Sequence, residues 1–126
     1  MNKVFKVGLI GCGHIAETYF RGHQYFNNFK IVACADINPK AAEKCAKLYN
    51  IKHMTVNEIL KDQNIEVILN LTIPQSHYSV SKRVLNAGKH VYSEKPLATY
   101  FEKGKELVSL AKKKKLYIGN APDTFL

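Results

Sequence analysis

The chain has 126 residues, and its 19 lysines and arginines against 10 aspartates and glutamates give a formal net charge of +9. This length suits one domain of ordinary size, and 46% hydrophobic with 23% charged residues argues against a disordered chain. No apolar run approaches the ~20 residues that cross a bilayer, and Lys3 and Lys6 interrupt the first apolar residues, so neither a membrane span nor a secretory signal is expected.

Short runs rich in valine and isoleucine alternate along the chain with segments whose apolar residues recur at helical spacing. The runs predict strands at residues 3–10, 30–36, 52–54, 66–71, 90–93 and 116–118. The amphipathic segments predict helices at residues 14–26, 39–49 and 76–87, and two more that open at Thr55 and Thr99. Apolar strands that alternate with helices indicate an α/β fold, namely a doubly wound parallel sheet of about six strands with helices on both faces.

Several helix ends carry local signals. Asn38 predicts an N-cap, and Pro39 suits the first helical position. The spacing T-x-x-E predicts capping boxes at Thr55–Glu58 and at Thr99–Glu102. Gly88 is the residue expected just beyond the end of the helix at 76–87.

The last predicted helix places Phe101, Val108 and Ala111 on one apolar face and ends in the block Lys112–Lys115. Cations suit the negative end of a helix dipole, and the other lysines are spread along the chain. The positive charge therefore indicates a solvated helix end that can also attract small anions, and no nucleic-acid partner is expected.

The first predicted strand runs directly into Gly11-x-Gly13-x-x-Ala16, which has the spacing of a dinucleotide-binding fingerprint. Gly11 permits a tight turn, Gly13 lets the backbone approach a pyrophosphate, and Ala16 is small enough for close packing of helix on strand. The helix start, at His14 and Ile15, offers N–H groups and a positive dipole end to phosphates. Glycines at such turns can serve the turn alone, but this turn follows a strand and opens a helix, which favours cofactor binding.

Asp36 follows the second predicted strand, where an acidic side chain can hold both hydroxyls of the adenosine ribose. Its alternative role, capping the next helix, is already filled by Asn38. A carboxylate at this position repels a 2′-phosphate, so the expected cofactor is NAD rather than NADP, with Ile37 beside the adenine ring.

Two further loops follow strands and so reach the same sheet edge. Thr72 and Ile73 are expected to line the adenosine side, and His77 is a candidate for cofactor contact, although a histidine at a helix start is more often a surface residue. Glu94 and Lys95 follow the fifth strand. A lysine beside a nicotinamide ring can exchange a proton with an alcohol whose carbon loses hydride, whereas a solvated loop is the alternative interpretation.

Taken together, these motifs resemble the Gfo/Idh/MocA oxidoreductases, the relatives of glucose–fructose oxidoreductase and inositol dehydrogenase. The fingerprint, Asp36, Thr72 with His77 five positions on, and Gly-Lys-His-Val-x-x-Glu-Lys-Pro at residues 88–96 occur in the family's order over nearly the whole chain. The resemblance implies an NAD(P)-dependent dehydrogenase that acts on CH–OH groups of sugars, inositols and related polyols.

By this resemblance, Lys95 would be the catalytic lysine and would contact the cofactor together with Glu94 and Pro96. Glu94 would lie by the nicotinamide ribose, and the Lys95–Pro96 bond would be cis. The sequence departs from the family's usual motif Thr-Pro-Asn-x-x-His, because Ile73 and Pro74 follow Thr72.

Family members continue into a second domain that supplies substrate contacts, an Asp/His pair and most of a homo-oligomer interface. We therefore expect residues 1–120 to form the dinucleotide-binding domain and residues 121–126 to begin the crossing to an absent substrate domain. Such a chain would bind the cofactor without efficient turnover, because half of the site wall is missing.

An alternative function on the same fold is a non-catalytic NAD(P) sensor or partner-binding module, which would have no use for a proton-exchanging lysine. The cysteines, Cys12, Cys34 and Cys45, are odd in number and lack C-x-x-C spacing, so neither a disulfide framework nor a metal site is expected. A reducing cytoplasm is the expected compartment.

Overall fold

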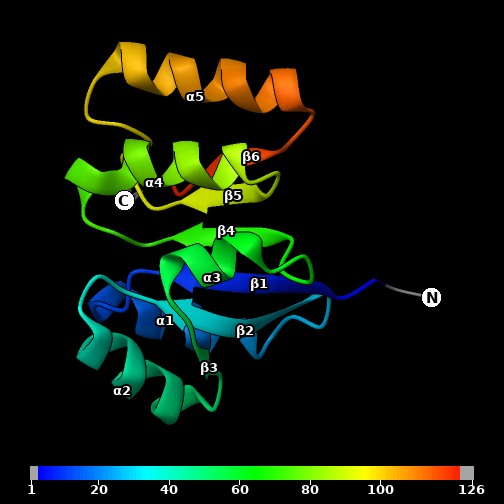
Figure 1. Ribbon diagram of the computed structural model, residues 1–126, viewed down its shortest axis with the longest axis vertical. Coiled ribbons are helices and arrows are strands. Elements are labelled where there is room, and N and C mark those ends of the chain that lie inside the picture. The colour runs from blue at the N-terminus through cyan, green and yellow to red at the C-terminus, as the bar shows by residue number, and fades with distance from the viewer. Residues whose placement is uncertain (1–2, 123–126) are drawn as a thin grey trace.

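The computed structural model describes residues 3–122, in which six parallel strands form one sheet. The strand order is β3-β2-β1-β4-β5-β6, so the chain reverses its direction of travel across the sheet at β1 (Figure 1). The strands are β1 (Phe5–Ile10), β2 (Phe29–Ala35), β3 (Lys52–His53), β4 (Val67–Asn70), β5 (His90–Ser93) and β6 (Ile118–Asn120). The predicted doubly wound α/β fold is confirmed.

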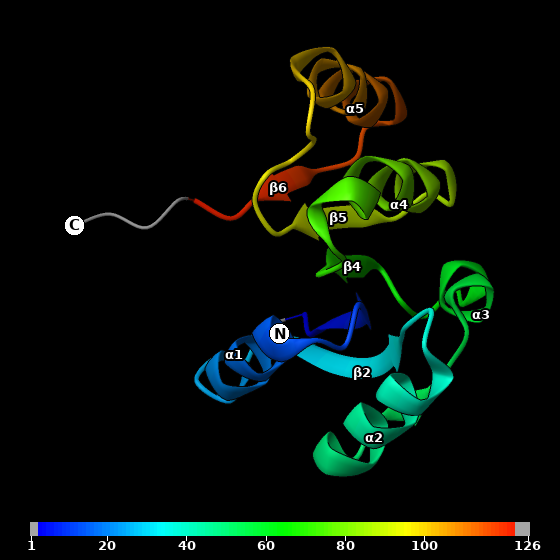
Figure 2. The same cartoon turned by 90° about the vertical axis from the view of Figure 1, so that its left-hand side faces the viewer.

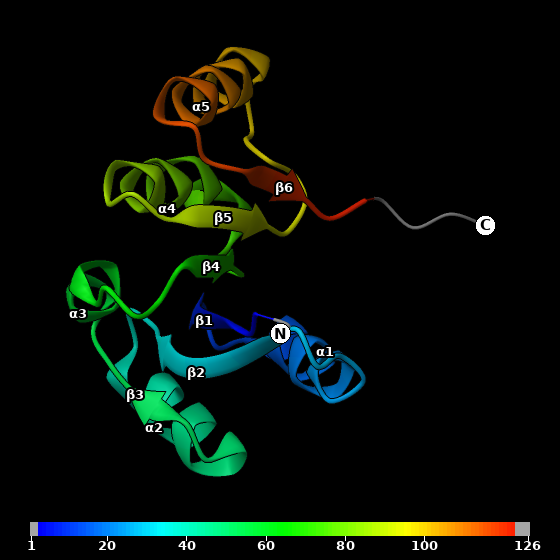
Figure 3. The same ribbon diagram turned by 90° about the vertical axis from the view of Figure 1, so that its right-hand side faces the viewer.

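Helices cover both faces of the sheet, as Figures 2 and 3 show from opposite sides. Helices α1 (His14–His23) and α2 (Pro39–Tyr49) pack on one face. The other face carries α3 (Val56–Lys61), α4 (Pro74–Asn86) and α5 (Phe101–Lys114). None of the helices within residues 3–122 is both long and apolar enough to span a membrane.

The sheet separates two apolar cores. On the α1/α2 face, Leu9 and Ile31 of the sheet pack with Phe20 of α1. On the opposite face, Ile68 of β4 packs with Leu107 of α5 in a cluster that also draws on α3 and α4. Because β1, β2 and β4 are covered by helices on both sides, their sequences are continuous apolar runs rather than an alternation of apolar and polar residues.

Local capping signals position three of the helices as predicted. The Asn38 side chain accepts a hydrogen bond from the Lys40 N–H, and Pro39 is the first residue of α2. Both hydrogen bonds of the Thr55–Glu58 capping box are present at the start of α3. Gly88 has a positive φ of +81° one residue after the C-cap of α4, which suits a glycine.

Two predicted helix boundaries are wrong near the ends of α1 and α4. Helix α1 stops at His23 instead of 26, because the Tyr25 and Phe26 N–H groups bond three residues back and tighten the chain into a turn. Helix α4 begins at Pro74 instead of 76, since the fixed φ of proline suits the first helical position.

The last helix and strand also differ from expectation. Tyr100, not Thr99, is the N-cap of α5, which shifts Glu102 out of the third helical position that a capping box requires. Of the predicted apolar face Ala111 is buried, but Phe101 is 81% exposed and Val108 is 49% exposed, and Leu107 packs with Ala111 in their place. Strand β6 starts at 118 rather than 116, because the Leu116 N–H still bonds to Ala111 of the helix.

Candidate functional site

The fingerprint turn follows β1 at the carboxyl edge of the sheet. Gly11 has a φ of +105°, and a Cβ there would stand 2.5 Å from the carbonyl carbon and oxygen of Leu71. A Cβ on Gly13 would meet nothing within 4 Å. Gly11 therefore allows the turn to lie against the end of β4, whereas Gly13 leaves a backbone surface open to a ligand.

The first turn of α1 has the features of an anion site. Its N-cap, Gly13, provides no side chain to bond the N–H groups of that turn. Ala16 is 3% exposed and packs under the helix, while His14 and Ile15 are exposed. This start of α1 fits the predicted pyrophosphate site, because its N–H groups and dipole favour negative charge.

Asp36 lies directly after β2 and is bonded to the fingerprint. One carboxylate oxygen accepts the Cys12 N–H at 2.7 Å, and the other accepts the Asn38 N–H at 2.8 Å. These bonds hold the carboxylate, which is half-buried, between the turn and the start of α2. Its neighbour Ile37 is 96% exposed, which leaves its apolar side chain available to a flat ring.

The loop after β4 is organised by Asn70, a fully buried residue at the strand end. Its amide donates to the His77 carbonyl at 3.0 Å and to the Ser81 hydroxyl at 2.8 Å. Its side-chain oxygen accepts the Thr72 hydroxyl at 2.6 Å, while Ile73 stays 63% exposed. Sequence reasoning missed Asn70, although one polar residue within Val-Ile-Leu-Asn-Leu was the available signal.

The interpretation of His77 as a surface histidine is wrong, because the residue is 1% exposed. One ring nitrogen lies 2.6 Å from the Thr72 carbonyl oxygen, and the other lies 2.6 Å from that of Pro96. The ring thus joins the loop after β4 to the loop after β5. The ring is buried between these two loops, and its contact with a cofactor stays a prediction.

The loop after β5 carries Glu94 and Lys95. The Glu94 N–H bonds to the Asn70 carbonyl, which continues the β4–β5 ladder to this point. The Tyr19 hydroxyl of α1 donates to a Glu94 carboxylate oxygen at 2.5 Å. Burial, and then the bond to Glu94, raises the pKa of the Tyr19 phenol. The Lys95 side chain is exposed, and the predicted cis bond before Pro96 is confirmed.

These contacts bring the loops after β1, β2, β4 and β5 to one edge of the sheet, on the left in Figure 1. The glycine turn, the Asp36 carboxylate and Lys95 are distant in the sequence but lie at this same edge. Such an edge, where the strand order reverses, is where doubly wound sheets bind ligands. The residues present fit a dinucleotide.

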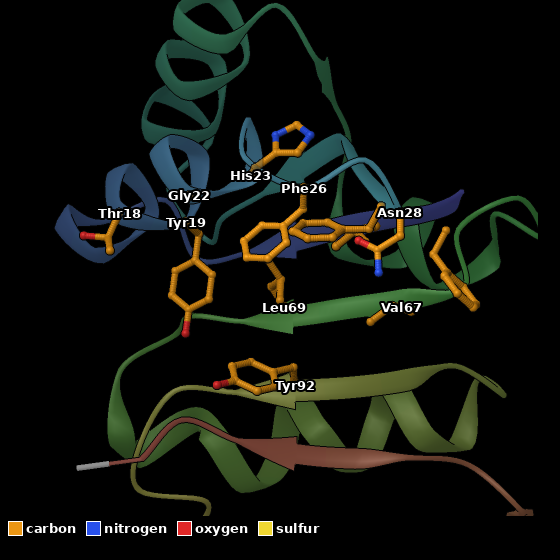
Figure 4. A pocket seen from close by; sticks show the side chains of 12 residues that line it. Thr18, Tyr19, Gly22, His23, Phe26, Asn28, Val67, Leu69 and Tyr92 are labelled. Carbon is orange, nitrogen blue, oxygen red and sulfur yellow. The ribbon is translucent and has the colours of Figure 1, made fainter. Parts of the chain in front are cut away.

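The α1 face also contains an apolar cavity of about 630 Å³, shown in Figure 4. Tyr19 and Tyr92 lie beside each other there, with ring centroids 6.4 Å apart, and Phe26, Val67 and Leu69 add apolar walls. The lining of this cavity is mostly apolar, so the candidate site for a phosphate-bearing ligand remains the carboxyl edge.

Comparison with known proteins agrees with the fold. Residues 5–121 match the family model described as "Oxidoreductase family, NAD-binding Rossmann fold" (GFO_IDH_MocA). An uncharacterized oxidoreductase of Schizosaccharomyces pombe is 38% identical over 95 residues, which are 73% of this chain and 26% of that protein. The chain thus spans about a quarter of the length of this relative.

Two solved structures illustrate the likeness in three dimensions. The myo-inositol dehydrogenase of Lactobacillus casei, in complex with NAD(H) and myo-inositol, is 27% identical with a TM-score of 0.85, over 94% of this chain and 36% of that one. The biliverdin reductase of Synechocystis, in complex with biliverdin and NADP+, is also 27% identical, with a TM-score of 0.84 over 91% of this chain and 37% of that one. The neighbours therefore include complexes of both NAD and NADP.

Proposed function

The chain belongs to the Gfo/Idh/MocA oxidoreductases, as an NAD(P)-binding Rossmann domain, and we propose that it binds NAD for a dehydrogenase that acts on a sugar, an inositol or a related polyol. One observation carries this proposal: the open backbone at Gly13, the Asp36 carboxylate and the Glu94–Lys95 pair share the carboxyl edge of one sheet.

Each group has a role that follows from its chemistry. The N–H groups at the start of α1 would bind the pyrophosphate, since no side chain of Gly13 intervenes. The Asp36 carboxylate would accept hydrogen bonds from the adenosine ribose hydroxyls. Because the same carboxylate repels a 2′-phosphate, we propose NAD as the preferred form.

The bound nicotinamide ring supplies the acceptor or donor of hydride. The exposed ammonium of Lys95 would hold or move the proton of the reacting hydroxyl. Glu94, fixed by Tyr19, would face the nicotinamide ribose. His77 and Asn70 would hold the loops after β4 and β5 in position. The Asn70 amide bonds to the His77 carbonyl, and the His77 ring lies between the carbonyls of Thr72 and Pro96.

The substrate class rests on the relatives. One structural neighbour at 27% identity holds myo-inositol, and a polyol hydroxyl suits a lysine as proton partner. Since the chain spans about a third of that neighbour, the reaction is proposed for a protein that includes a second, substrate-binding domain. Residues 121–126 are the proposed start of that crossing; of these, 123–126 lie outside the described residues.

Titration of the chain with NADH, followed by nicotinamide fluorescence, tests the cofactor role. Gly13→Glu should abolish binding, because a carboxylate would stand where the pyrophosphate belongs. Gly22→Glu is the matched control, since a Cβ there also meets nothing within 4 Å but lies at the far end of α1. Equal NADH affinity of the two variants would exclude the proposed site.

Hydride transfer tests the catalytic role in the protein that includes the substrate domain. Lys95→Met should lower kcat for polyol oxidation by ~10²–10⁴-fold, the usual contribution of a general acid or base, with NADH affinity retained. If kcat is unchanged, Lys95 is not the proton carrier.

A further inference from the structure

The three cysteines of the sequence meet in the fold. Cys12 lies in the fingerprint turn, Cys34 in β2 and Cys45 in α2, and their three Sγ atoms all lie within 4.8 Å of one another. Cys34 and Cys45 are buried and Cys12 is half-buried. The separations along the chain match no metal-binding motif, so only the packing of α2 on the sheet reveals the cluster.

Single buried cysteines often serve as small apolar side chains. Here, however, every thiol of the chain points to one place from a separate element. Around a zinc ion with Zn–S bonds of ~2.3 Å, tetrahedral geometry sets neighbouring sulfur atoms ~3.8 Å apart. The thiols therefore need to approach one another by no more than about 1 Å to share a cation.

We propose that Cys12, Cys34 and Cys45 form a site for one thiophilic divalent cation of the Zn²⁺ class. Three thiolates are soft ligands that select such ions over Mg²⁺ or Ca²⁺. The fourth position would hold a water molecule, as in zinc sites that have three protein ligands. Binding releases the three thiol protons to solvent, so it strengthens as pH rises.

The cluster has an entry path. A cavity of about 460 Å³ between α1 and α2 is lined by Cys12 and Cys45, together with Gly13 and Lys44. Cys34 closes the site from the sheet side, with its sulfur 3.4 Å from the Ala42 carbonyl oxygen. Cys12 and Cys45 thus border an open space, and Cys34 lies on the sheet side of them.

The site would tie the fingerprint to its neighbours. Cys12 stands between Gly11 and Gly13, and its N–H bonds to the Asp36 carboxylate. A cation on the Cys12 sulfur would join this turn to β2 and α2 without using any residue proposed to contact the dinucleotide through its side chain. Because Gly13 also lines the entry cavity, the metal and the proposed dinucleotide would share this turn, and a Cd²⁺ titration without dinucleotide tests the metal site alone.

Titration of the reduced chain with Cd²⁺ tests the site through its ultraviolet thiolate charge-transfer band. The band should saturate at one Cd²⁺ per chain, the half-buried Cys12 thiol should lose its reaction with Ellman's reagent, and Zn²⁺ should displace Cd²⁺. Failure of the band to appear at equimolar Cd²⁺ would overturn the proposal.

Variants locate the site. Cys12→Ser and Cys45→Ser should each weaken Cd²⁺ binding by at least about tenfold, since even the loss of a residue behind a metal ligand costs ~10–100-fold. Ala41→Ser, in the wall of the same cavity, is the matched control and should bind as the parent does. Circular dichroism confirms that each variant is folded, and unchanged affinity in both folded cysteine variants would also overturn the proposal.

Discussion

Tyr19 of α1 donates its hydroxyl to the carboxylate of Glu94, 2.5 Å away in the loop after β5. The bond crosses from the helix that follows the fingerprint to the loop that carries Lys95. It therefore fixes the spacing between the proposed phosphate end and the proposed reactive end of the crevice.

Tyr19→Phe should lower the free energy of unfolding by about 1 kcal/mol, because the half-buried carboxylate loses a hydrogen-bond donor. Urea unfolding measures this change. Tyr25→Phe is the control, since Tyr25 is 81% exposed and its loss of a hydroxyl should have no measurable effect. Equal stability of the two variants would show that the Tyr19 bond contributes nothing.

The same bond predicts a pH dependence. The pKa of the Tyr19 phenol is raised above its ordinary value of 10.0, first by burial and then by Glu94. As pH rises, the unfolded chain therefore loses this proton before the folded chain does. The contribution of the neutral hydroxyl to the free energy of unfolding is complete below pH 10 and is lost as pH rises above 10. The stability difference between parent and Tyr19→Phe should shrink there, and a constant difference would contradict the assignment.

Two glycine substitutions should act in opposite directions. Gly11→Ala should destabilise the chain by ~2–3 kcal/mol or prevent folding, because φ is +105° and the Cβ would stand 2.5 Å from Leu71. Gly22→Ala, in the last turn of α1, should stabilise it by ~0.5–1 kcal/mol, since a Cβ meets nothing within 4 Å. Thermal unfolding of both variants gives the comparison, and a tolerated Gly11→Ala would refute the turn geometry.

His77→Ala should cost about 3 kcal/mol of stability, because it leaves a cavity and removes the ring N–H that bonds the Thr72 or the Pro96 carbonyl. His53→Ala, at an exposed position in β3, should stay within ~0.5 kcal/mol of the parent. Urea unfolding distinguishes them. A similar small effect for both would mean that the ring does not hold the loops together.

Asp36→Ala should weaken NADH binding by ~10–100-fold, the value of one hydrogen bond to a charged group, while NADPH binding should not weaken. Glu43→Ala removes an exposed acid of α2 that pairs with Lys47 and should leave NADH binding unchanged. Fluorescence titration measures all affinities. Parent protein that binds NADPH as tightly as NADH would contradict the proposed preference for NAD.

The fold was predictable because its signals are local. Buried parallel strands need continuous apolar runs, and the caps at Asn38 and Thr55 act through bonds to residues two or three positions away. The Thr99 capping box fails for the same reason: a helix start displaced by one residue, to Tyr100, removes the partner from the required position.

The support of the candidate site was not predictable, since it depends on contacts between distant segments. His77 is buried with one ring nitrogen against the carbonyl of Pro96, nineteen positions on. The hydroxyl of Tyr19 meets Glu94 across 75 positions. A sequence indicates which residues lie in the loops at the sheet edge, but tertiary packing decides which residues hold those loops in position.

The position of β1 at the centre of the sheet also governs how the protein is made. Val7 pairs with Ile31 of β2 on one side and with Val67 of β4 on the other. In a nascent chain, one edge of β1 therefore has no partner strand until β4 has been synthesised. At ~5–20 residues per second, that interval lasts a few seconds. The Asp36 half of the crevice can thus assemble on the ribosome earlier than the Lys95 half, and chaperones that shield bare strand flanks would act during this interval.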